Sequence, residues 1–414
     1  MNKDNLDELS LLIALVFLIA GFAMYFNSSD LNKSVLAQGE VGTPKPFSAI
    51  QVAQEVKENG TTTTTTTTTN SQIKNVQFSI DKSQFKKAPE LAKIGEYINT
   101  APIKLSDLRG KVVLVDFWTY SCINWIRTLP YLNEWNEKYA DKGLVILSVH
   151  TPEFEFEKNI DNVMAAAKKF GIKYPVVQDN ERGTWNAYEN RYWPRIYLVD
   201  NEGYIRYDHI GEGGYAETEK VIQSLLQERA VQIGIKDATL LNLNNSITTT
   251  TTPKGVQSVD FSQIKTPELY FGYHLARTSL GNPEGHRPNQ TVTYSFPSSS
   301  SSDIKPNIIY LDGKWKNNAD NMELQSDTGR IALTYSAKSV NIVAGGKGGE
   351  EVSISEDGKP LSAESYGQDL SEGSKFVVDG PRLYNLSMHD GYGNHSLIMD
   401  VKGKGFQTYA FTFG

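Results

Sequence analysis

A chain of 414 residues is too long for one ordinary domain, so two folded units joined by linkers are expected. The formal net charge of −7, with no basic stripe along the sequence, argues against nucleic acid as a partner. A single cysteine excludes an intrachain disulfide, so each folded unit must be stabilised by its own core.

The N-terminal part of the chain contains one long apolar stretch, Leu9 to Phe26, without a charged residue. Its length of about 18 residues is just enough to span a bilayer. It follows Asp7 and Glu8, whereas a secretory signal normally begins with positive charge, so an uncleaved anchor is favoured over a cleaved signal. We therefore predict a transmembrane anchor over residues 1–28, with the bulk of the chain on the extracytoplasmic side.

Two threonine-rich tracts divide the rest of the chain. The first, Thr61 to Thr69, lies in a segment that cannot bury enough apolar surface to offset its chain entropy, so residues 29–75 are predicted to form a disordered stalk. The second, Thr248 to Thr252, marks a linker over residues 233–258.

Residues 76–232 show patterns of strands alternating with helices, which predict an α/β domain whose strands are covered by helices. Apolar, β-branched runs are typical of buried strands, and the amphipathic segments between them are typical of helices. Strands are expected at 112–115, 145–149, 174–177, 195–199 and 204–207, and helices at 159–170 and 216–229.

Residues 259–414 have a different character, because helical periodicity fades and short alternating runs are separated by glycine-rich turns. Strands repeating about every 8–12 residues predict an all-β sandwich of the jelly-roll or galactose-binding-like type. The expected strands are 308–311, 331–335, 339–343, 352–355, 396–401 and 406–413.

The stretch with the clearest chemical meaning runs from Val112 to Pro130. After the buried strand, a tight turn at Thr119 to Ser121 brings Cys122 to the start of a helix. The positive end of the helix dipole and the unpaired N–H groups there favour a thiolate. Cys122 is therefore the candidate nucleophile, and the alternative is a buried, inert cysteine.

This layout resembles the active site of thioredoxins, which carry the run Asp116 to Trp118, the cysteine and the later proline in the same places. The resemblance implies a proton-transfer role for Asp116 toward a second cysteine. That second cysteine is replaced here by Trp125, so the alternative is that Asp116 is only a buried polar group tied to neighbouring backbone.

The resemblance also extends to Pro194, which precedes the predicted strand 195–199 where thioredoxin-like folds carry a cis-proline facing the active cysteine. We expect the Trp193-Pro194 bond to be cis and Pro194 to belong to the catalytic site. Trp118, Trp125 and Trp193 are predicted to shape the substrate groove.

Three longer stretches resemble the DipZ-type, TlpA-like thiol–disulfide proteins more narrowly. They read FWTYSCINWIRTLPYL, VHTPEFEFEK and TWNAYENRYWPRIYLVD, and TPELYFGY with IIYLDGKW extends the likeness into the second domain. The resemblance implies a thioredoxin-like domain followed by a carbohydrate-binding-module-like β-sandwich. Two features depart from the family: one predicted span replaces its polytopic membrane module, and its Cys-Ile-Asn-Cys motif ends here in Trp125.

Loss of the second cysteine limits the chemistry, because one thiol can attack a disulfide but cannot release the mixed disulfide by itself. The leading hypothesis is a monothiol oxidoreductase that exchanges with protein thiols and disulfides and uses no cofactor. A peroxide-reactive thiol is a weaker alternative, since Val115 stands where the peroxiredoxin motif has proline. The rival of another class is a non-catalytic cell-surface protein that binds glycans or proteins on a thioredoxin scaffold.

No metal site is predicted, because the six histidines show no ligand-like spacing and no second cysteine accompanies Cys122. Glycans are a further possible partner of the second domain through an aromatic surface, although most such residues are core or turn aromatics. No feature of the sequence decides the oligomeric state. The candidate sugar-binding residues are Tyr270, Tyr273, Trp315, Tyr384 and Tyr392.

Overall fold

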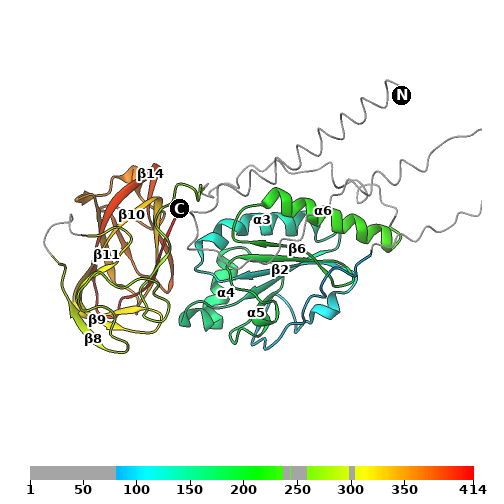
Figure 1. Ribbon diagram of the computed structural model, residues 1–414, viewed down its shortest axis with the longest axis horizontal. Helices are drawn as coiled ribbons and strands as arrows, with labels where there is room; N and C mark the ends of the chain where they lie inside the picture. The colour runs from blue at the N-terminus through cyan, green and yellow to red at the C-terminus, as the bar shows by residue number, and fades with distance from the viewer. Residues whose placement is uncertain (1–80, 236–242, 244–258, 298–303) are drawn as a thin grey trace, which may run out of the picture. The chain divides into compact units, whose positions relative to one another are not determined.

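The computed structural model describes residues 81–235, 243, 259–297 and 304–414 (Figure 1). All of these fall within one unit of mutual contacts, Thr62–Gly414. The predicted anchor, the stalk and most of the linker lie outside the described residues. Within the part of the chain that is described, no helix is both long and apolar enough to cross a membrane.

The first domain is built on a six-stranded sheet with the order β1-β4-β3-β2-β5-β6. Strands β2, β3 and β4 are parallel, whereas β1, β5 and β6 run antiparallel to their neighbours. All seven residues of β2 are buried, as its apolar run predicts. The strands are β1 (Tyr97–Ile98), β2 (Val112–Trp118), β3 (Leu144–His150), β4 (Val176–Gln178), β5 (Arg195–Val199) and β6 (Ile205–Ile210).

Side chains of β2 alternate between two apolar cores, one on each face of the sheet. Leu114 and Trp118 pack with side chains of α3, α4 and α6, while Val115 and Phe117 pack with Trp185 of α5. Figure 1 shows α3 and α6 running along the same side of the sheet. The prediction of an α/β domain is thereby confirmed. The helices are η1 (Leu105–Leu108), α3 (Ile123–Tyr139), η2 (Glu155–Lys158), α4 (Ile160–Lys169), α5 (Gly183–Ala187) and α6 (Tyr215–Gln232).

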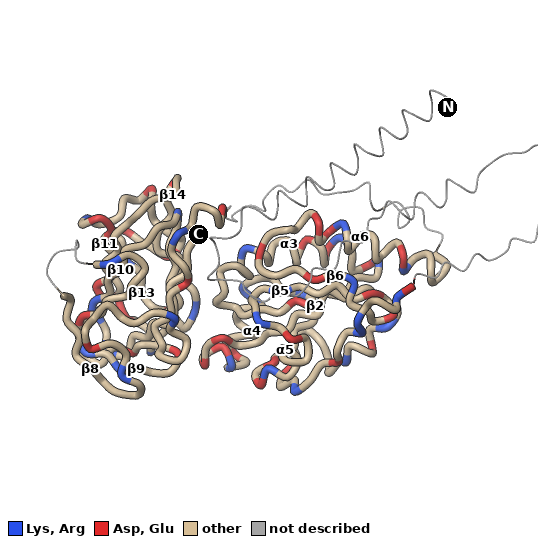
Figure 2. The backbone as a smooth tube through the Cα atoms, viewed as in Figure 1, with Lys and Arg blue, Asp and Glu red and all other residues tan. Residues whose placement is uncertain are grey.

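Charged residues of both signs are interspersed over the described chain (Figure 2). One group of them is buried: the ammonium of Lys82 lies 2.9 Å from Asp200 and 3.0 Å from Glu228, and Arg206 contacts the same two carboxylates. Because buried charges are stable only when paired, this network fixes the start of the first domain against the β5–β6 turn and α6.

The second domain is all-β, as predicted, and its strands form a nine-stranded antiparallel sheet with one large core. The path β12-β11-β14-β10-β15-β7 is joined by β13 on β11 and by β8 and β9 beside β10. The strands are β7 (Leu269–Tyr270), β8 (Thr291–Tyr294), β9 (Tyr310–Asn317), β10 (Met322–Gly345), β11 (Glu351–Glu356), β12 (Lys359–Pro360), β13 (Lys375–Val377), β14 (Arg382–Lys402) and β15 (Gln407–Phe413), with the short helix η5 (Ala363–Ser365).

The prediction of uniformly short strands is wrong for β10 and β14, which have 24 and 21 residues. The expected strands 331–335 and 339–343 are both parts of β10. The residues between them continue β10 without a turn, and the extra residues are in β14, where a bulge shifts the register before the ladder continues. A bulge bends and twists a strand without ending it, which the sequence pattern does not distinguish from a loop.

Candidate functional site

Cys122 lies at the N-cap of α3, at the end of the turn that follows β2. Its backbone N–H donates to the carbonyl of Thr119 at 3.2 Å, which closes that turn. The half-buried Sγ lies 3.9 Å from the carbonyl oxygen of Trp193, and the Trp193-Pro194 bond is cis, as expected. The fold therefore brings together the candidate nucleophile and the predicted cis-proline.

Two contacts hold the ring of Trp193 in place. Its indole N–H donates to the carbonyl of Thr151 at 3.0 Å, and its ring lies 4.3 Å from that of Trp185. It is half-buried, so part of its surface is available beside Cys122. Of the three tryptophans predicted to shape a groove, this one lies next to the thiol.

The other two tryptophans have no exposed surface, so the predicted groove role is wrong for Trp118 and Trp125. Their rings stack on each other at 4.1 Å. The indole N–H of Trp125 donates to Oδ2 of Asp116 at 2.9 Å, and Ser148 donates to the same oxygen at 3.1 Å. The large ring at the position of the second cysteine therefore turns inward, where its N–H satisfies the buried acid.

Asp116 is itself fully buried, and burial raises its pKa to about 7, against the lowering effect of its bonds from Trp125 and Ser148. Its other oxygen, Oδ1, has no hydrogen bond among the described residues. The carboxyl of Asp116 is thus bonded to two side chains rather than to neighbouring backbone. Trp125 stands where thioredoxins have the second cysteine, to which this acid would transfer a proton.

The expectation of a thiolate at Cys122 needs correction. Burial raises the pKa of the thiol well above its usual range, and the nearby carboxylates of Glu268 and Glu153 act in the same direction. Hydrogen bonds from the backbone of Trp125 and Asn124 lower it, but burial has the larger effect. The surroundings of the thiol therefore disfavour the thiolate, contrary to the expectation from the helix start alone.

Glu157 was not singled out by its sequence, yet it organises the turn before Cys122. One carboxylate oxygen accepts from the hydroxyl of Ser121 at 2.6 Å, and the other accepts from the backbone N–H groups of Glu153 and Phe154. The residue is fully buried, and burial raises its pKa. The only signal in the sequence was its place in the acidic and aromatic stretch that follows the second buried strand.

His150, at the end of β3, is a second unforeseen neighbour of the turn. Its ring stacks on Tyr120 with centroids 5.8 Å apart, and its Nε2 lies 3.5 Å from the hydroxyl of Thr119. The residue is fully buried, and burial lowers its pKa to about 3. A neutral imidazole therefore packs beneath the turn at neutral pH.

Tyr270, predicted to bind sugar, is buried and bridges two carboxyl groups instead. Its hydroxyl lies 2.7 Å from Glu153 Oε1 and 2.6 Å from Glu268 Oε2. A phenol has one proton to donate, so two contacts of this length require a proton on one of the carboxyls. Burial raises the pKa of both acids, which is consistent with a shared proton.

The remaining sugar-binding candidates do not form one aromatic surface. Trp315 and Tyr384 are fully buried in the core of the second domain, so a platform role is wrong for them. Tyr273 and Tyr392 are half-buried, and the hydroxyl of Tyr392 accepts a hydrogen bond from the backbone N–H of Asp260. For Tyr273 and Tyr392 the role stays a prediction.

A cavity of about 740 Å³ opens beside the Cys122 turn. Its lining includes Tyr120 and Ile123, which flank the turn and the start of α3, and the charged groups of Arg127, Asp369 and Arg382. The lining is thus partly apolar and partly charged, as in many sites for extended ligands.

Comparisons with known proteins match both domains. Residues 86–208 match the AhpC/TSA family and residues 266–414 match a thioredoxin like C-terminal domain. Protein DipZ of Mycobacterium tuberculosis is 34% identical over 372 residues, which are 88% of this chain and 48% of DipZ. The chain therefore spans about half the length of the DipZ proteins that it matches.

Two further proteins are similar to part of the chain. The thiol-disulfide oxidoreductase ResA of Geobacillus kaustophilus is 32% identical over 124 residues, covering 30% of this chain and 67% of ResA. The crystal structure of a thiol-disulfide isomerase from Corynebacterium glutamicum is 25% identical, covers 34% of this chain and 96% of its own, and has a TM-score of 0.31.

Proposed function

The chain belongs to the thioredoxin-like thiol–disulfide oxidoreductase family, and on that premise we propose that it exchanges with protein disulfides through one nucleophile, Cys122. The observation that carries this proposal is the position of its sulfur, at the N-cap of α3 and 3.9 Å from the carbonyl of Trp193. That carbonyl, just before Pro194, is placed to accept a backbone hydrogen bond from an extended substrate.

The proposed exchange has two steps. The Cys122 thiolate attacks one sulfur of the partner's disulfide, so a mixed disulfide forms and the partner's other cysteine leaves as a thiolate that takes up the proton. A second thiol then attacks the mixed disulfide and releases Cys122. If that thiol belongs to the partner, disulfides are rearranged without net electron transfer. If it is an external thiol, the partner is left in a mixed disulfide with it, and a second external thiol completes the two-electron reduction and leaves as an external disulfide.

Trp125 explains why the second step is expected to be slow. In a dithiol site the second cysteine resolves the mixed disulfide, but here a buried indole hydrogen-bonded to Asp116 fills that position. The single-thiol mechanism therefore predicts a long-lived mixed disulfide with the partner.

The test is to mix the reduced full chain with a disulfide-containing protein, quench by alkylation, and count mixed disulfides by mass spectrometry. We expect them on Cys122 and none in Cys122→Ser. The matched control is the same chain in denaturant, whose thiol is exposed. If only the denatured chain reacts, the fold blocks the chemistry and the proposal fails.

A second candidate function, a non-catalytic binding protein on a thioredoxin scaffold, is favoured by one observation: burial raises the pKa of the Cys122 thiol. Alkylation by iodoacetamide against pH separates the two proposals. A midpoint well below that of a free thiol, about 8.5, supports exchange chemistry, whereas a midpoint at or above it supports the scaffold.

We also propose that Leu9 to Phe26 anchors the chain with residues 30–414 outside the cytoplasm, because this stretch is uncharged and long enough to span a bilayer. Protease added to intact cells is then expected to cleave within Thr61 to Thr69. Cleavage only after lysis would reverse the orientation.

For the second domain we propose a carbohydrate-binding-module-like sandwich whose glycan contacts come from Tyr273 and Tyr392, the two candidates that keep exposed surface. A glycan array with the full chain tests this proposal. Binding that is lost in Tyr392→Ala supports it, and silence across neutral, acidic and amino sugars would leave the domain as a spacer or a protein contact.

A further inference from the structure

Strand β14 carries a large bulge that gathers two histidines far from Cys122. Its pairing with β10 passes from Met388 opposite Ser339 to Gly393 opposite Ala337, so residues 389–392 stand against the single residue Lys338. Beyond the bulge the regular ladder resumes. The extra residues bend the strand back so that side chains on its two sides come together.

The bulge places the rings of His389 and His395 face to face, with centroids 4.1 Å apart and planes 10° from parallel. The two residues are six positions apart, and in a regular strand that separation would put them about 20 Å from each other along the chain. This is why the spacing of histidines in the sequence carried no signal of a metal site. The pairing geometry of β14 creates the cluster.

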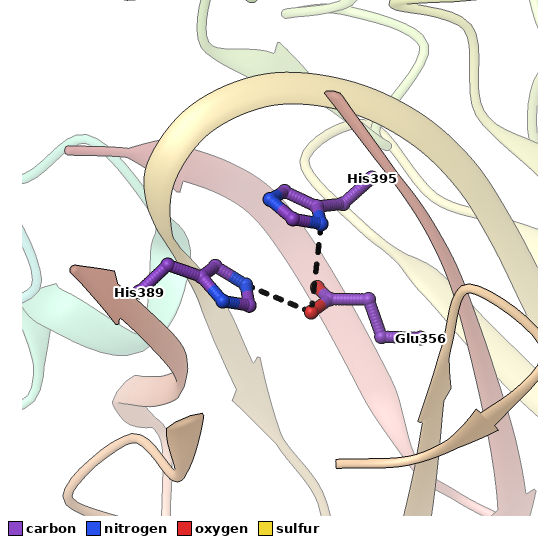
Figure 3. A group of neighbouring side chains, drawn as sticks. All are labelled: Glu356, His389 and His395. Atoms are coloured by element: carbon purple, nitrogen blue, oxygen red, sulfur yellow. Dashed lines mark ion pairs between the residues drawn. The ribbon is translucent and has the colours of Figure 1, made fainter. Parts of the chain in front are cut away.

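A carboxylate completes this cluster from the neighbouring strand. Glu356, the last residue of β11, pairs with Leu397 of β14 and is nearly fully buried. Strand β11 lies along one edge of β14, and β10 lies along the other. Its Oε2 lies 2.8 Å from Nε2 of His389 and 4.0 Å from Nδ1 of His395. Figure 3 shows both rings turning a nitrogen toward this carboxylate, and one ligand atom of each residue lies within 4.8 Å of the other two.

Hydrogen bonds orient the carboxylate for a ligand. Oε1 of Glu356 accepts from the buried hydroxyl of Tyr335 at 2.5 Å and lies 3.4 Å from that of Ser387, which leaves Oε2 to face the histidines. A ligating carboxylate in a metal site is held in the same way by an outer group. Tyr335 pairs with His395 across β10 and β14, so the same ladder positions both.

The nitrogen of His389 that faces the carboxylate is not satisfied by it. Nε2 is buried and makes no hydrogen bond among the described residues, although Oε2 is only 2.8 Å away, because the oxygen lies outside the direction required for such a bond. A buried imidazole nitrogen that lies close to a carboxylate without a directed hydrogen bond is able to bind a metal ion in its place.

We propose that Glu356, His389 and His395 bind one divalent transition-metal ion of the zinc class, a site independent of the proposed exchange at Cys122. Two imidazoles and a carboxylate are typical ligands of Zn²⁺. A tetrahedral ion with bonds of about 2.0–2.1 Å sets its ligand atoms about 3.3 Å apart, so the observed separations, the largest within 4.8 Å, need to change by roughly 1.5 Å or less. Asp357, whose Oδ2 lies 3.0 Å from Nδ1 of His395, must release that nitrogen on binding.

The competing explanation is an ion pair between protonated His389 and Glu356 with no ion between them. The two explanations differ in what zinc does. A metal site binds one equivalent per chain and raises the melting temperature when loaded, whereas an ion pair binds no zinc and leaves the melting temperature unchanged when zinc is added.

The experiment uses the full chain in a Cys122→Ser background, so that the thiol is not an alternative ligand. After removal of metal by a chelator, zinc is titrated in by isothermal calorimetry, and Co²⁺ is added separately to give the visible absorption of a tetrahedral site. We expect one equivalent of zinc to bind, and affinity to fall about tenfold or more in His389→Ala.

Glu356→Gln serves as the second variant, because it retains an acceptor for Tyr335 while removing the anionic ligand. The matched control is His274→Ala, an exposed histidine of the same domain, which is expected to bind zinc unchanged. Circular dichroism of the metal-free variants checks folding. Absence of stoichiometric zinc binding in the parent chain, or equal binding in the parent and in both site variants, overturns the proposal.

Discussion

The Cys122 turn and the β14 bulge each gather chemically active side chains, but by different routes. At the turn, the strand, the cysteine and the helix follow one another directly in the sequence, and groups such as the Trp193 carbonyl are added from other segments. At the bulge, a register shift between strands brings His389 and His395 together beside Glu356. A contiguous motif is visible in a sequence, whereas a site made by strand pairing is visible only in the fold.

The largest effect is expected from Trp125→Cys, which restores a second thiol at the turn. It is placed three residues after the first, within reach across one helical turn. Turnover in a disulfide-reduction assay with dithiothreitol is expected to rise well above wild type, and to vanish when Cys122→Ser is added.

This substitution also removes a fully buried ring, so the free energy of unfolding is expected to fall by about 3–5 kcal/mol. Trp125→Phe is the matched control, since it keeps an aromatic ring but loses the hydrogen bond to Asp116. Loss of that bond is expected to lower the free energy of unfolding by about 1–3 kcal/mol. Folded Trp125→Cys protein without a gain in turnover would favour the scaffold proposal.

The second prediction concerns Asp116, whose pKa is raised to about 7 in the fold from an ordinary value of 3.8. Between these values the folded state binds a proton that the unfolded chain has released, so the contribution of Asp116 to stability is greatest below about pH 4 and is lost as the pH rises to about 7. The loss is no more than roughly 4 kcal/mol.

Asp116→Asn is expected to remove this part of the pH dependence, because the amide does not titrate. The measurement is urea unfolding of both chains at several pH values from 4 to 8. Parallel curves for the two chains would mean that Asp116 ionises normally in the folded protein.

A smaller effect is expected at the thiol itself. The carboxyl of Glu153 raises the pKa of Cys122, so Glu153→Gln should lower that pKa and speed alkylation at pH 8 by roughly threefold, which corresponds to about half a pKa unit. Glu155→Gln, two residues along and exposed, is the control. Equal rates in the two variants would mean that the carboxyl of Glu153 does not raise the pKa of the thiol.

The smallest effect on stability is expected for His389, at the β14 bulge, in the metal-free protein. Glu356 raises the pKa of His389, so the contribution of this pair to stability is present below the ordinary histidine pKa, about 6.5, and is lost as the pH rises through the raised value. In chelator, His389→Gln should lower stability at pH 5.5 by less than about 1 kcal/mol and have no effect at pH 9. A persistent difference at pH 9 would point to packing of the ring rather than to its charge.

Much of the first domain could be predicted because its elements are signalled locally. The apolar run of β2 predicts a buried strand, and Asn159 caps α4 as its position before an amphipathic run suggests. In the second domain the all-β class was predictable, but the lengths of β10 and β14 were not. Their bulges resemble loops in the sequence, and only pairing with a neighbour shows that the strand continues.

The sequence by itself determined the α/β class of the first domain, the place of Cys122 at a helix start, and the presence of Trp125 three residues later, since each depends on residues close together in the chain. The tertiary structure decided how much of each side chain is buried and what lies beside it. Burial raises the pKa of the Cys122 thiol and turns Trp125 toward Asp116, and strand pairing brings His389 to Glu356. Desolvation and contact arise from segments far apart in the chain, so no local pattern carries them.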